Sequence, residues 1–115
     1  MTVFEYPEVV VALEEWAGCC AEPWSYTTSH GVLRVKLGWR ERGECVVLFM
    51  KGCGRVVFDQ AWDGFAPSIV AYEGLHGRRF RVTDATRLDV DCGSVYLSRH
   101  LGSYAEIPAD PTARP

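Results

Sequence analysis

The segment Lys51–Phe58 (KGCGRVVF) sets a cysteine between two glycines, directly after one apolar run and directly before another. Glycines at such a junction indicate a tight turn. The runs on either side are rich in β-branched and aromatic residues, as strands are. Because residues 45–50 are apolar at every position, the first run is typical of a central strand with both faces covered. We therefore expect two neighbouring antiparallel strands joined by a turn at Gly52–Cys53 or Cys53–Gly54.

Side-chain parity then predicts which residues of this hairpin share a face, because antiparallel partners point the same way. Both turn placements group Val47, Phe49, Val56 and Phe58 on one face, and Val46, Leu48, Met50, Val57 and Asp59 on the other. If Trp39 opposes Cys45, the first face also receives Leu33, Val35 and Leu37 and becomes the core face. The second face is then left uncovered, with Arg34 and Lys36 beside it, and needs further strands, a subunit or a ligand to cover it.

A second Cys-Gly step follows the same pattern near the end of the chain. Cys92-Gly93 separates two alternating segments, so a hairpin there would place Leu88 and Val90 on one face with Val95 and Leu97. An earlier turn centred on residues 85–87 would set Arg81 against Asp91 and Thr83 against Asp89. Opposite charges facing each other across two strands stabilise an outward face.

One helix is indicated, over residues 7–17. Pro7 suits the first helical turn, Gly18 suits the left-handed cap, and apolar residues recur at helical spacing on one side. Together these features predict an α+β fold, with an N-terminal helix packed on a strongly twisted antiparallel sheet of about six or seven strands. A half-barrel is the most curled form of such a sheet. Residues 1–107 are expected to form a single domain, and residues 108–115, which hold the prolines Pro108, Pro111 and Pro115, a flexible tail.

Composition excludes several classes of function. The chain has 115 residues, is 48% hydrophobic and 23% charged, and carries a net charge of -3, so nothing in bulk charge favours nucleic acid. Four glutamates in the first 15 residues argue against a signal sequence or membrane span, and a cytoplasmic location is expected. Five cysteines without a C-x-x-C motif fit reduced thiols. We expect no metal and no cofactor.

Cys53 raises the question of thiol chemistry. Lys51 and Arg55 could stabilise its thiolate, but charges that splay into solvent around a turn act weakly. His30, His76 and His100 could each serve as a base, yet none lies in a recognisable catalytic motif. A small cysteine-dependent hydrolase or transferase is therefore the alternative interpretation, and a protein without enzymatic activity is the favoured one.

Aromatic residues give the leading candidate site. Trp24 and Trp62 fall in loop-like segments, where they could rim a cleft together with Tyr26, Asp63 and His30. Stacking aromatics beside a few polar groups suit a planar or sugar ligand or a partner's side chain. The competing interpretation, favoured by the usual burial of tryptophan, is that Trp24 and Trp62 plug the open ends of a curved sheet.

The function expected from the sequence is a small bacterial-type binding or protein-interaction module. It would act through this aromatic-rimmed cleft or through the uncovered apolar face, on a small-molecule ligand or a protein partner. The expected interface residues are Val46, Leu48, Met50, Val57, Arg34 and Lys36. An uncovered apolar sheet face favours self-association, so a homodimer is expected, with no nucleic acid and no membrane as partner.

Overall fold

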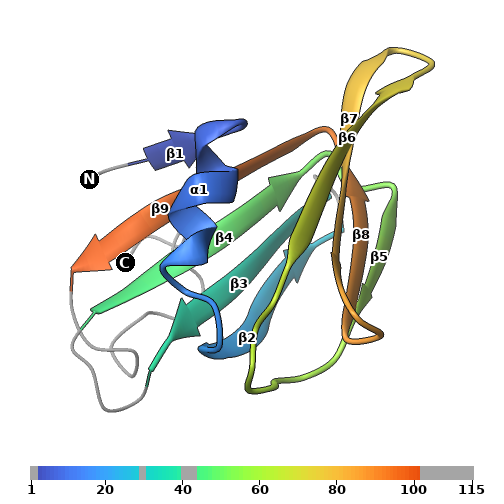
Figure 1. The fold of residues 1–115 in the computed structure, drawn as a ribbon. Helices are drawn as coiled ribbons and strands as arrows, with labels where there is room; N and C mark the ends of the chain where they lie inside the picture. Colours follow the sequence, from blue (N-terminus) through green and yellow to red (C-terminus); the bar gives the residue numbers. More distant parts are fainter. Residues whose placement is uncertain (1–2, 29–30, 40–43, 102–115) are drawn as a thin grey trace, which may run out of the picture.

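The computed structural model describes residues 3–28, 31–39 and 44–101, and the predicted tail at 108–115 lies outside them (Figure 1). In chain order the elements are β1 (Val3–Glu5), α1 (Glu8–Glu14), β2 (Cys20–Thr27), β3 (Val32–Gly38), β4 (Glu44–Lys51), β5 (Arg55–Phe58), β6 (Ser68–Gly74), β7 (Gly77–Asp84), β8 (Leu88–Cys92) and β9 (Ser94–Leu101). No helix among these elements is both long and apolar enough to cross a membrane.

The strands form two antiparallel sheets. The first, sheet A, has the order β1-β9-β4-β3-β2, and the second, sheet B, has the order β5-β8-β7-β6. The antiparallel character and the presence of one helix agree with the sequence prediction. The single sheet of six or seven strands is wrong, because the described residues divide nine strands between two sheets. The half-barrel and the 1–107 domain boundary stay predictions.

The two Cys-Gly steps are corners between the sheets. At Gly52–Gly54 the chain leaves β4 in sheet A and enters β5 in sheet B, and at Gly93 it returns from β8 to β9 (Figure 1). Both predicted hairpins are therefore wrong: β5 pairs with β8, and β9 pairs with β4 and β1. Parity did not reveal the error, because strands that meet at a corner can alternate inward and outward as regularly as hairpin partners.

The register between β3 and β4 differs by one residue from the predicted one. Gly38, and not Trp39, lies opposite Cys45, so Val35 lies opposite Leu48. A one-residue slip moves a whole set of side chains to the other face. Leu33, Val35 and Leu37 consequently share a face with Val46, Leu48 and Met50, and all six are at most 2% exposed. The face predicted to be uncovered is the core face of sheet A.

The β7–β8 hairpin confirms the third register prediction. Arg81 lies opposite Asp91 and Thr83 opposite Asp89, with the turn between Asp84 and Leu88. Ala85 in that turn has a φ of 50°, in the left-handed region.

The helix is shorter than predicted, ending at Glu14 rather than residue 17. Val9 and Leu13 are buried in the core cluster that also contains Val82 of sheet B. Burying each of these two side chains contributes about 1.5–3 kcal/mol. Gly18, with φ at 88°, then turns the chain and donates its N–H to the Phe65 carbonyl at 2.8 Å.

A buried carboxylate fixes the segment that links β5 to β6. Asp84, 5% exposed, accepts hydrogen bonds at Oδ2 from Trp62 Nε1 (2.7 Å) and from the Ala66 N–H (3.2 Å). Removing the acceptor leaves the buried Trp62 ring N–H without its partner, which costs roughly 1–3 kcal/mol for a buried group, whereas Ala66 is exposed and its N–H can bind water instead.

We therefore expect Asp84→Ala to lower the free energy of unfolding by about 1–3 kcal/mol, measured by urea denaturation. Asp84→Asn keeps an acceptor and should lose less. The control is Asp63→Ala, since Asp63 is exposed and gives only its backbone carbonyl to Arg87. A loss for Asp84→Ala no greater than for the control would contradict this role.

Candidate functional site

An apolar pocket of about 450 Å³ lies between α1 and sheet A. It is lined by Phe4 of β1, by the α1 residues Glu8, Val11 and Ala12, by Glu15 and Trp16 just after the helix, by Val46 of β4 and by Leu97 of β9. This volume lies within the range of about 300–1,000 Å³ that small-molecule sites occupy.

One stripe of α1 supplies a wall of the pocket. Glu8, Val11 or Ala12, and Glu15 are spaced three, four and seven residues apart, which places them on one side of a helix. The same helix turns Val9 and Leu13 into the core. The helix is thus anchored through one side, while the neighbouring stripe faces the pocket.

The polar groups of the pocket are two carboxylates. Glu8 and Glu15 are exposed, whereas the other lining residues are alanine, valine, leucine and aromatic side chains. In sequence, residues 1–33 contain five glutamates and neither lysine nor arginine. An apolar hollow with an acidic mouth favours a ligand that joins an apolar body to a positive charge.

Trp16 gives the pocket a rigid aromatic wall. It is 6% exposed, and its ring stacks on Trp39 with centroids 5.6 Å apart and planes inclined by 23°. A ring already held in this way loses little conformational entropy when a ligand packs against it.

The aromatic cleft predicted from the sequence is not assembled by the described side chains. Trp62 is 7% exposed, bridges Ala21 at the start of β2, and packs beside Phe65. Tyr26 lies five residues further along β2, about 17 Å away at the rise of a strand. Burial of Trp62 favours the plugging interpretation for that residue.

The other members of the predicted cleft are Asp63, Trp24 and His30. Asp63 is exposed, and its carbonyl accepts a hydrogen bond from Arg87 Nη1 at 2.7 Å. Trp24 lies in β2, but its side chain and the whole of His30 fall outside the described part of the structure.

The predicted interface residues divide among three places. Val46, Leu48 and Met50 lie in the core, so the prediction that they form an uncovered interface is wrong. Arg34, 5% exposed, donates from Nη1 to Ser25 Oγ at 3.3 Å, and its guanidinium lies 5.6 Å from the Phe49 ring centroid. Two members are more accessible. Lys36 pairs with Glu22 at 3.9 Å, and Val57 is 45% exposed on sheet B.

Three of the thiols lie where burial disfavours the thiolate that a nucleophile needs. Burial raises the pKa of Cys19 and that of Cys92 to about 12, and burial also raises the pKa of Cys53. The Cys53 Sγ donates to the Met50 carbonyl at 3.3 Å, so the thiol form is the one with a partner. Within residues 3–28, 31–39 and 44–101, no three His, Cys, Asp or Glu side chains gather as a metal site would need.

The raised pKa of Cys53 predicts slow alkylation. Only the thiolate reacts, and a pKa above the ordinary value of 9.0 leaves less thiolate near neutral pH. We expect Cys53, followed by mass spectrometry with iodoacetamide at pH 7.5, to react more slowly than free cysteine, and to accelerate as the pH rises. The Cys53→Ser variant identifies the adduct. Faster reaction than free cysteine would contradict this environment.

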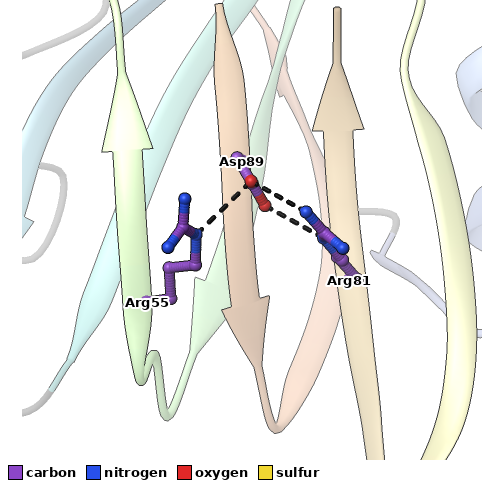
Figure 2. A network of polar contacts seen from close by, with 3 residues as sticks. All are labelled: Arg55, Arg81 and Asp89. Atoms are coloured by element: carbon purple, nitrogen blue, oxygen red, sulfur yellow. Dashed lines mark hydrogen bonds and ion pairs between the residues drawn. The ribbon is translucent and has the colours of Figure 1, made fainter. Parts of the chain in front are cut away.

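A charged network crosses the outer face of sheet B. Figure 2 shows Asp89 of β8 between Arg81 of β7 and Arg55 of β5. Arg81 binds it with two bonds, Nε to Oδ1 at 3.1 Å and Nη2 to Oδ2 at 3.0 Å, and Arg55 Nε lies 3.4 Å from Oδ2. Hydrogen bonding to Arg81 lowers the pKa of Asp89 below its ordinary 3.8.

Asp89 should therefore make stability depend on acidity. Its depressed folded-state pKa stabilises the fold above the unfolded-state value, and that contribution is lost as the pH falls through the folded-state pKa. We expect the gap in unfolding free energy between wild type and Asp89→Asn to be largest near neutral pH and to close below about pH 4. Asp63→Asn is the control. A gap that does not change between pH 7 and pH 3 would exclude this linkage.

The sequence contains a signal for one wall of the pocket, and this signal lies in the helix and not in the alternation of the strands. Glu8, Val11, Ala12 and Glu15 are at helical spacing, beside the predicted buried stripe. The opposite wall of the pocket was not predicted, because the predicted β3–β4 register places Val46 on the other face of sheet A.

Comparison with models of protein families, with curated proteins and with solved structures finds no match to the chain.

Proposed function

We propose that the protein binds a small amphiphilic cation, an apolar body carrying a protonated amine, in the pocket between α1 and sheet A. The observation that carries this proposal is the pairing of apolar walls with Glu8 and Glu15 at the mouth of a 450 Å³ hollow. This proposal agrees with the binding module expected from the sequence, but its site is the pocket at Trp16 and not a cleft at Trp24 and Trp62.

The walls and the carboxylates contribute differently. Apolar surface removed from water supplies about 25 cal/mol per Å², so the apolar lining residues that still expose surface, Phe4, Val11 and Ala12, supply most of the affinity. An exposed ion pair is worth about 0.2–1 kcal/mol, which is at most roughly a fivefold preference for each glutamate. The glutamates thus select the sign of the ligand's charge.

The thiol environments support binding over catalysis. A nucleophilic cysteine needs its thiolate stabilised, whereas burial raises the pKa of Cys19, Cys53 and Cys92. The cysteine-dependent hydrolase or transferase therefore loses its main chemical support, and we do not propose it as the function.

Three ligands with one chain length test the proposal: decylammonium, decanol and decanoate, each below its micelle concentration. We expect calorimetry to give the affinity order ammonium, alcohol, carboxylate, because the apolar part is common and only the head group changes. Trp16 fluorescence should shift on binding, since its ring lines the pocket. No binding by any of the three, or the reverse order, would reject the proposed ligand class.

Two pairs of variants locate the site. Val11→Lys places a cation at the mouth and should weaken decylammonium binding at least about tenfold, whereas Val10→Lys makes the same charge change on the neighbouring exposed residue outside the lining. The double change Glu8→Gln and Glu15→Gln should remove the preference for ammonium over alcohol, and Glu14→Gln should keep it. Equal effects within either pair would place the ligand elsewhere.

A further inference from the structure

β6 is an edge strand with one neighbour. Residues Ser68–Gly74 pair with β7, and within the described part of the chain no other element packs along the opposite side of β6 (Figure 1). The outward N–H and C=O groups of such a strand are a template for another strand.

The other three sheet edges carry features that oppose strand addition. β1 has three residues and β5 has four, which is short for a ladder. β2 contains Pro23, and its register with β3 shifts between Pro23 and Ser25. Short edges, proline and irregular register are known protections against edge pairing. β6 has seven residues, with no proline, lysine or arginine.

β6 and its turn also expose apolar surface. Val70 is 56% exposed and Tyr72 39% exposed, and both lie on the outer face, while Leu75 in the following turn is 98% exposed. Tyr72 Oη donates to Asp91 Oδ1 at 2.6 Å, which holds the ring in place beside Val70. A fixed tyrosine presents contact area at small entropic cost.

We propose that two copies of this chain pair antiparallel through β6, about a twofold axis at Ala71, to join their B sheets into one of eight strands. A twofold axis normal to the sheet keeps the outer faces of both copies on the same side. Directly opposite residues of antiparallel strands point to the same face, so the axis must pass through a residue that pairs with its own copy. Ala71 is the midpoint of Ser68–Gly74, and pairing about it includes all seven residues of the strand.

This register matches the exposed apolar side chains. Val70 lies opposite Tyr72 of the second copy, and Leu75 comes opposite Pro67, the half-buried residue just before β6. The exposed apolar side chains of the outer face thus meet apolar partners from the same chain, and on the inner face Ile69 lies opposite Glu73. The interface lies on sheet B and shares no residue with the pocket beside α1, so it goes beyond the ligand-binding proposal.

Two lysine variants test the interface by sedimentation at micromolar to millimolar concentrations. We expect wild type to be a dimer and Val70→Lys to weaken dimerisation at least about tenfold, because lysine on an edge opposes pairing. The matched control is Val57→Lys, the same change on the outer face of edge strand β5, which should stay dimeric. Circular dichroism verifies that both variants are folded.

A cysteine pair tests the register. Ala71→Cys brings two thiols together at the axis, within the Cα separation of less than about 7 Å that a disulfide needs, so oxidation should yield a covalent dimer. Ser68→Cys is the control, since two copies of residue 68 would lie about 20 Å apart along the strands. A monomeric wild type, including one that binds an added extended peptide at β6, overturns the proposal. So does equal crosslinking of both variants, or loss of the dimer in Val57→Lys.

Discussion

Backbone hydrogen bonds at one corner hold the two sheets in their relative positions. The Gly93 N–H donates to the Lys51 carbonyl and the Gly54 N–H to the Asp91 carbonyl, both at 2.8 Å, so the two crossings are tied to each other. The Cys53 N–H donates to the Gly31 carbonyl at 2.9 Å, and a Cβ on Gly31 would lie 3.0 Å from that nitrogen. With φ at 60°, glycine is required there by conformation and by space. Cys53 thus lies at the corner between the sheets, where its backbone N–H bond to Gly31 holds it in position.

Much of the molecule follows from this corner. It directs β5 and β8 into a second sheet, so the apolar face of β3 and β4 is covered by the chain itself, with Leu48 and Met50 fully buried. The helix α1 contacts β1 and β9 of sheet A. The pocket lies beside this seven-residue helix, and Val46 and Leu97 line the pocket as well as the core.

Local patterns in the sequence predicted local structure and failed where distant segments had to be matched. The β7–β8 register followed from a three-residue turn and from the charges of Arg81 and Asp91. The partner of β4 did not, because a corner and a hairpin give the same alternation at Gly52–Gly54. The predicted β3–β4 register was wrong because Gly38, and not Trp39, lies opposite Cys45, and this shift of one residue exchanges the faces of Val46 and Val47. That exchange turned a core face into a supposed interface and hid the wall of the pocket.

The pocket and the β6 edge are joined by a short series of contacts. Phe4 lines the pocket, and two residues later the Tyr6 ring lies 4.8 Å from Phe80, which is opposite Ala71 in the β6–β7 ladder. Arg78 of β7 also lies over the Tyr6 ring, 5.6 Å from its centroid. A ligand changes dimer affinity only if it binds the two association states differently, and the effect is then reciprocal. If a ligand contacts Phe4 and leaves Tyr6 in place against Phe80, this series of contacts gives no difference in ligand affinity between monomer and dimer. Coupling along this series of contacts therefore requires displacement of Tyr6.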